Sequence, residues 1–117
     1  MTEAAFLALT ALAGEPRYGY GIVGEVDVLS GGRVRLSVGT LYGVLDRLAA
    51  DRLVELDREE VHNGRLRRYY RLTDQGADVL AAEAERLAGN AEAAARRLRA
   101  RQAPGPRTRP GPAGGAA

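Results

Sequence analysis

The 117-residue chain contains no cysteine, no tryptophan and no lysine, and it has a single histidine. Without cysteine, neither disulfide bonds nor thiolate metal sites can form, and His62 alone cannot build a histidine metal cluster. An enzyme is also disfavoured, because nucleophilic catalysis needs a nucleophile with a positioned base. The acidic pair Glu59-Glu60 does not supply a site, since neighbouring residues of a strand point to opposite faces. We therefore expect no metal, no cofactor and no catalytic activity.

The chain also has little net charge and no long apolar run. Its formal charge is only +2, although all of its 17 basic residues are arginine. Arginine offers a planar fork of donors that suits phosphates and guanine edges, but codon bias would produce the same composition. A nucleic-acid surface must therefore come from where the arginines lie. No apolar run is long enough to span a bilayer and no basic segment precedes one, so we expect a cytoplasmic protein.

Hydrophobic periodicity predicts three helices in the first half of the chain, at about residues 2–14, 19–30 and 38–51. Thr2 and Ser37 are in position to cap the first and third helices, and Gly31-Gly32 would end the second. The third helix has two distinct faces. Its aliphatic face carries Leu41, Leu45 and Leu48, and its short, polar and basic face carries Thr40, Gly43 and Arg47.

A β-hairpin is predicted at residues 53–72, because two segments of alternating pattern flank Asn63-Gly64, a strong turn signal. In the first arm, Val54 and Leu56 are expected to point inward, and Glu55 and Asp57 outward. From His62 to Leu72 there are four arginines and no acid, so positive charge gathers on the tip and return arm. A solvated edge strand, kept from aggregating by its charge, is the alternative interpretation.

The last predicted helix spans residues 73–101 and would be about 42 Å long. It would extend beyond a core made by the preceding elements, so its narrow apolar seam needs a partner, and a second copy of the chain is the simplest one. Residues 102–117 are rich in Pro, Gly and Ala and are expected to be disordered. The residues of the predicted dimerisation seam are Leu80, Leu87, Ala91, Ala94 and Leu98.

Three helices followed by a hairpin with a basic tip is the order of elements in a winged helix-turn-helix. The predicted fold is mostly α with a small β-hairpin, with residues 1–72 as a DNA-binding domain and residues 73–101 as a dimerisation helix. In such a fold the third helix enters the major groove and the wing follows the backbone or minor groove. A two-fold dimer would read an inverted-repeat operator. The alternative is a winged helix used for protein interaction and dimerisation without specific DNA binding.

Three segments together resemble the PadR family of bacterial transcriptional regulators: YGYGI (18–22), LSVGTLYGVLDRLAADRLV (36–54) and GRLRRYYRLTDQG (64–76). The last helix is similar to the single dimerisation helix of the family's short subgroup. The resemblance implies a regulator of transcription, expected to be a repressor, that a small aromatic or lipophilic effector releases from DNA. Some relatives stack drugs on a tryptophan of the last helix, and the absence of tryptophan excludes that route here.

The resemblance also implies roles for individual residues. At the start of the third helix, phosphate and base edges would be contacted by Ser37, Gly39 and Thr40. Tyr42 would lie at the rim of the groove and Arg47 would reach a phosphate. The expected wing contacts are Arg65, Arg67 and Arg68. Four residues depart from the family pattern, with Val38 and Gly43 in place of the usual prolines, Ala49 of a glutamate and Arg52 of a glycine.

Overall fold

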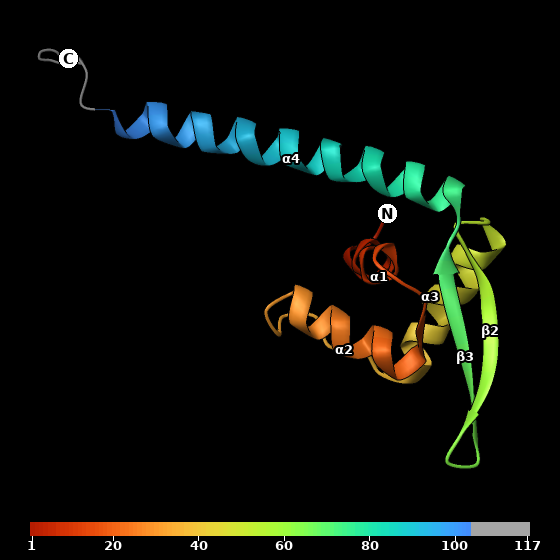
Figure 1. Cartoon of the computed structure of the whole chain (residues 1–117). Helices are drawn as coiled ribbons and strands as arrows, with labels where there is room; N and C mark the ends of the chain where they lie inside the picture. Colours follow the sequence, from red (N-terminus) through yellow and green to blue (C-terminus); the bar gives the residue numbers. More distant parts are fainter. Residues whose placement is uncertain (104–117) are drawn as a thin grey trace, which may run out of the picture. The chain divides into compact units, whose positions relative to one another are not determined.

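A computed structural model describes residues 1–103 and shows a winged helix (Figure 1). The elements are α1 (Glu3–Ala13), β1 (Arg17–Tyr18), α2 (Gly19–Leu29), α3 (Val38–Ala50), β2 (Val54–His62), β3 (Arg65–Leu72) and α4 (Asp74–Gln102). The first compact unit is Met1–Ala84, and the second begins at Glu85 with the remainder of α4. Most of the tail that was predicted to be disordered lies outside the described residues. Within residues 1–103, no helix combines the length and apolarity needed to cross a membrane.

The predicted helix starts are confirmed by their capping contacts. The Thr2 side chain accepts a hydrogen bond from the Ala5 N–H, and the Ser37 side chain accepts one from the Thr40 N–H. Each of these contacts satisfies a backbone donor that has no partner inside the helix. After α2, Gly31 and Gly32 adopt positive φ angles of 62° and 81°, as a helix-terminating glycine pair requires.

The core of the first unit is aliphatic and lies where α1, α2 and α3 meet the base of the sheet. Leu9, Ile22, Leu41 and Leu45 have no exposed surface, and Leu48 is 5% exposed. The predicted inner face of α3 is therefore confirmed. Burying an aliphatic side chain of this size contributes roughly 1.5–3 kcal/mol to the free energy of folding. The row of buried leucines on α3 therefore fixes the rotation of this helix about its axis.

The sheet contains one strand more than predicted. β1 pairs antiparallel with β3, which gives the order β1-β3-β2. The sequence predicts no strand between the first two helices, because the two residues of β1 lie between a proline and glycines that mask so short a strand. The turn at Asn63-Gly64 is confirmed, with φ angles of 52° and 76°.

Leu56 was predicted to point inward but is not buried, since 47% of its surface is exposed. The pairing between β2 and β3 shifts between Leu56 and Arg58, so Asp57 is an extra residue on β2 with no cross-strand partner. Such a bulge bends the strand and changes the direction of its side chains. Leu56 precedes the bulge and alternates regularly with Val54, so the bulge does not account for its exposure. The Asp57 side chain, predicted to point outward, keeps only 19% of its surface exposed.

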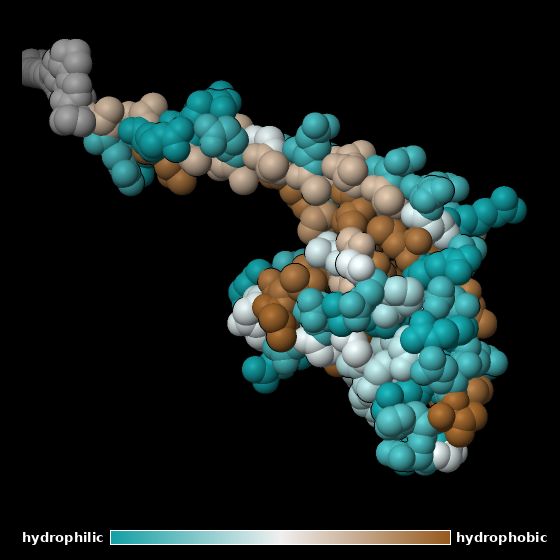
Figure 2. Space-filling model, in the orientation of Figure 1, coloured by the Kyte–Doolittle hydropathy of each residue, from teal (hydrophilic) through white to brown (hydrophobic). Residues whose placement is uncertain are grey.

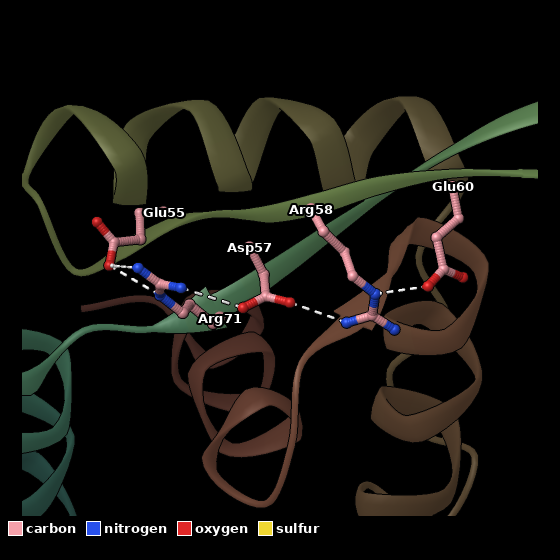
Figure 3. A network of polar contacts seen from close by, with 5 residues as sticks. All are labelled: Glu55, Asp57, Arg58, Glu60 and Arg71. Atoms are coloured by element: carbon pink, nitrogen blue, oxygen red, sulfur yellow. Dashed lines mark hydrogen bonds and ion pairs between the residues drawn. The ribbon is translucent and has the colours of Figure 1, made fainter.

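Five charged side chains form a continuous network on β2 and β3 (Figure 3). Arg71 donates to Glu55 at 2.9 Å and to Asp57 at 3.1 Å. Arg58 donates to Asp57 at 2.8 Å and to Glu60 at 2.7 Å. The hydrogen bonds from Arg58 and then Arg71 hold the pKa of Asp57 below its ordinary value. The hydrogen bond from Arg58 is also the main cause of a lowered pKa at Glu60.

The Asp57 network should make the wing sensitive to acid. Because the folded-state pKa of Asp57 is lowered from 3.8, its contribution to stability is present at neutral pH and is lost as the pH falls through the folded-state pKa. Asp57→Asn should therefore be less stable than wild type at pH 7, and the gap should narrow toward about pH 3. Urea unfolding at both pH values measures this. A stability gap that stays constant between the two pH values would contradict the network's role.

A left-handed arginine ends α3 and connects it to the wing. Arg52 has a φ of 63°, and its N–H donates to the Ala49 carbonyl while the Leu53 N–H donates to the Leu48 carbonyl. These two bonds make a Schellman ending, which usually has glycine at the left-handed residue. The Arg52 carbonyl in turn accepts a hydrogen bond from Thr73 Oγ1 at 2.7 Å. The departure from glycine noted in the sequence therefore places backbone strain at this turn.

Arg52→Gly should stabilise the protein. The left-handed conformation costs a non-glycine residue about 1–2 kcal/mol. Glycine removes this cost, but it lowers stability by about 0.4–1 kcal/mol because it increases the entropy of the unfolded chain. The expected gain in the free energy of unfolding is about 0.5–1 kcal/mol, measured by urea denaturation. Asn63→Gly is the matched control and should gain less, because asparagine tolerates this conformation. A loss of stability in Arg52→Gly would show that its side chain matters more than its backbone strain.

Candidate nucleic-acid interface

The start of α3 presents a shallow polar surface. Ser37 Oγ accepts from the Thr40 N–H at 3.1 Å and donates to Thr40 Oγ1 at 2.9 Å. Gly39 and Thr40 are exposed, and a side chain added at Gly39 or Gly43 would meet no atom within 4 Å. The opposite face of the helix is buried in the core. An approaching duplex would therefore meet small polar groups and bare backbone on this face.

Tyr42 connects α3 to both α2 and the wing. A Cβ at Gly19 would lie 2.9 Å from Tyr42 Oη, so only glycine allows α2 to begin this close to the ring. On its other side, Tyr42 packs edge-on against Tyr70, with ring centroids 6.5 Å apart. Burial raises the pKa of Tyr70 above its ordinary value. Tyr42 is thus held in place from two directions.

The three predicted wing arginines have different surroundings. Arg65 makes no ion pair with any described residue. Arg67 lies flat over the Tyr18 ring, with its Cζ 4.2 Å from the ring centroid. Arg68 donates to Glu59, its cross-strand neighbour, at 3.1 Å. Of these three arginines, only Arg68 has an ion-pair partner among the described residues, so Arg65 and Arg67 are the more available to bind an anion.

A groove of about 340 Å³ brings most of these side chains together. It runs between the tip of the wing and the tyrosines of β1, α2 and α3, and no acidic residue lines it. Among the predicted residues it contains Tyr42, Arg65, Arg67 and Arg68. The predictions missed the remaining members, which are Tyr18, Tyr20, His62, Asn63 and Leu66. The sequence signal that could have found two of them is the pair of tyrosines in the YGYG segment.

Not every predicted residue lies in this groove. Ser37, Gly39 and Thr40 are at the exposed start of α3 and do not line it. Arg47 lines a separate hollow of about 240 Å³, with Met1 and Thr2 on its α1 side. Among the described residues, no three histidine, aspartate or glutamate side chains come together as a metal site would require.

The space-filling view shows hydrophilic and hydrophobic surface side by side on the wing (Figure 2). Hydrophilic surface covers much of the tip of the β2–β3 ribbon, and a hydrophobic patch lies beside it. The exposed apolar residues of the ribbon tip are Val61 and Leu66, which pair across the two strands. The tip therefore combines arginines with a small apolar contact surface.

The predicted seam residues lie in two parts of α4. Leu80 packs against the core of the first unit. The other four belong to the second unit, where Leu87 is 39% exposed and Leu98 is 55% exposed. Ala91 and Ala94 are also exposed. This apolar row has no partner within the described chain that buries it.

Comparison with known proteins identifies the fold and the family. The chain is 41% identical over 86 residues to an uncharacterized 37.1 kDa protein of transposon TN4556 from Streptomyces fradiae, covering 74% of this chain but only 23% of that protein. It resembles the crystal structure of a PadR family transcription regulator from Clostridium difficile, with a TM-score of 0.70 and 24% identity, over 83% of this chain and 99% of the other.

A third similar structure is that of Bacillus subtilis PadR in complex with operator DNA. The TM-score is 0.59 at 20% identity, and the match covers 67% of this chain and 44% of that one. At such identities the structural likeness shows the winged-helix fold. The family assignment comes from residues 8–82, which match the model of the transcriptional regulator PadR-like family. These residues include α3, the wing and the groove between them, and the chain belongs to the PadR-like family of transcriptional regulators.

Proposed function

We propose that this protein is a sequence-specific DNA-binding regulator that represses transcription as a homodimer. The observation that carries the proposal is the acid-free groove between the wing and Tyr42 of α3, which contains Arg65 and Arg67 without ion-pair partners among the described residues. Phosphates are the matching ligands for such arginines. The solved complex of Bacillus subtilis PadR with operator DNA supports the same use of this fold. A protein acting on bacterial DNA would work in the cytoplasm.

In this proposal α3 and the wing have different roles in DNA binding. The exposed start of α3, with Ser37, Gly39 and Thr40, would enter the major groove and contact base edges. Tyr42 would lie at the rim of that groove. The wing arginines would contact phosphates, which position the protein but carry little sequence information. Arg47, which lines a separate hollow, would contact a phosphate independently of the wing.

The exposed row on α4 would form the dimer contact. Residues 73–101 are proposed to pair with a second copy through Leu87, Ala91, Ala94 and Leu98, with Leu80 at the junction with the core. A two-fold dimer would place two α3 helices about 34–36 Å apart on one face of the duplex. The operator would then be an inverted repeat.

The last part of the proposal is a small aromatic or lipophilic effector that binds the dimer and releases it from DNA. A thermal-shift screen of such compounds would test this part.

Mutating the helix and the wing should have separable effects on DNA binding. Thr40→Ala should weaken operator binding by roughly 1–3 kcal/mol if Thr40 makes a specific base contact, and leave random-sequence binding almost unchanged. Arg65→Ala should weaken both, and make the negative slope of log affinity against log salt shallower by about 0.9 for each lost phosphate contact. Titrations of operator and scrambled duplexes at several salt concentrations measure both effects. An unchanged slope for Arg65→Ala would favour the solvated-edge interpretation of the wing. A wild type that never prefers the operator would favour a protein-interaction module.

Leu87→Arg should convert the proposed dimer to a monomer. Leu87 is partly exposed in the single chain, so the substitution should be tolerated there, but in the dimer it would bury an unpaired charge at a cost of several kcal/mol. Sedimentation equilibrium should show a monomer with weakened DNA binding. Ala88→Arg adds the same charge about 100° around the helix and should remain dimeric. A wild type that is monomeric at micromolar concentration would disprove dimerisation through α4.

A further inference from the structure

Tyr18 lies at the centre of a stack of side chains that the proposed function does not explain. The Arg67 guanidinium covers the Tyr18 ring, with its Cζ 4.2 Å from the centroid. Tyr18 in turn contacts Tyr69, with centroids 5.5 Å apart and ring planes tilted by 54°. At the other end, Arg58 lies over the Tyr69 ring at 3.9 Å. The stack therefore runs cation, ring, ring, cation.

The register of the sheet builds this stack from three strands. Tyr18 of β1 pairs with Tyr69 of β3, and Arg58 of β2 pairs with Tyr69 from the other side. Arg67 lies two residues from Tyr69 on β3, so both side chains project from the same face of the sheet. The short strand β1 is therefore what brings the Tyr18 ring under Arg67.

The two arginines of the stack differ in their charge partners. Arg58 donates to Asp57 and to Glu60, so two carboxylates neutralise it. Glu60 is the cross-strand neighbour of Arg67, but its hydrogen bond goes to Arg58 at 2.7 Å. Among the described residues, Arg67 forms no ion pair within hydrogen-bonding distance, although the pKa of Glu60 is lowered mainly by the hydrogen bond from Arg58 and, to a smaller extent, by the charge of Arg67. An aromatic ring thus holds Arg67 in place while its charge remains available.

A stacked guanidinium can still bind an anion. Stacking occupies the flat face of the group, whereas its N–H donors lie in the plane and point outward. Arg67 also lines the acid-free groove beside the wing. A free arginine side chain would lose much rotational freedom when it contacts a phosphate, and an arginine already ordered by a ring would lose less.

We propose that Tyr18 is a positioning residue for DNA binding, because its ring orders Arg67 for contact with a backbone phosphate. This inference rests on the proposed DNA-binding function. Tyr18 acts through Arg67 and needs no contact with DNA itself. The ring and not the hydroxyl group is the part that matters, so phenylalanine should replace it and leucine should not.

The test is a double-mutant cycle on the full-length protein. Tyr18→Leu and Tyr18→Phe are each made in wild type and in Arg67→Ala, and binding to a random-sequence duplex of about three helical turns is titrated at several salt concentrations. A sequence-independent probe is suitable because phosphate contacts carry the predicted effect. Melting temperatures of all variants are measured alongside.

Tyr18→Leu should bind about two- to fivefold more weakly than wild type, the range expected for an exposed cation–π contact. Its slope of log affinity against log salt should become shallower, toward that of Arg67→Ala. Tyr18→Phe should keep both the affinity and the slope. In the Arg67→Ala background, Tyr18→Leu and Tyr18→Phe should bind alike, because no guanidinium remains to be ordered.

Each other outcome overturns the proposal. Equal weakening of wild type and Arg67→Ala by Tyr18→Leu would mean a general defect of the sheet or a direct DNA contact. A Tyr18→Phe variant as weak as Tyr18→Leu would assign the effect to the hydroxyl group, and full affinity in Tyr18→Leu would remove the effect altogether. Failure of wild type to bind any duplex at low salt would instead refute the DNA-binding function on which the inference rests.

Discussion

The packing of the aliphatic row on α3 is the constraint on which the proposed interface depends. Leu41, Leu45 and Leu48 are buried against α1 and α2, together with Val44. A helix that must bury one continuous face has no freedom to rotate, because turning it by even one residue would expose a leucine. The opposite face, with Gly39 and Thr40, is therefore set toward solvent by residues that never contact a ligand. In the proposed function, α3 would serve both stability and DNA recognition, with leucines on its buried face and Gly39 and Thr40 on its exposed face.

The wing depends on a second set of contacts, which are aromatic. Tyr42 packs on Tyr70 from the α3 side, and Tyr18 packs on Tyr69 from β1. An isolated two-stranded ribbon is marginal in water, so these pairs anchor its base to the helices. Gly19 makes the first anchor sterically feasible, since any side chain there would meet the Tyr42 hydroxyl. The segment that joins α1 and α2 thus supports the wing, which is distant in sequence.

Local signals in the sequence were sufficient for much of the fold. The caps at Thr2 and Ser37, the turn at Asn63-Gly64 and the leucine spacing on α3 each involve residues close in the chain, and each is confirmed. The failures involve pairing between distant segments. A strand as short as β1 has no periodicity, and the bulge at Asp57 appears only in the register of β2 with β3.

For the candidate site, the arginines of the wing could be predicted, but the Tyr18 ring under Arg67 could not. That contact depends on the same long-range pairing.

The pairing of β2 and β3 also gives the ribbon an uneven distribution of charge. Its acids, Glu55, Asp57, Glu59 and Glu60, all lie on β2, while Arg65 and Arg67 lie near the tip without ion-pair partners among the described residues. The ribbon is therefore an electric dipole with its positive end at the tip. Near a polyanion, such a dipole experiences a torque before any contact forms, so it would turn the wing toward the duplex and act mainly on the rate of association.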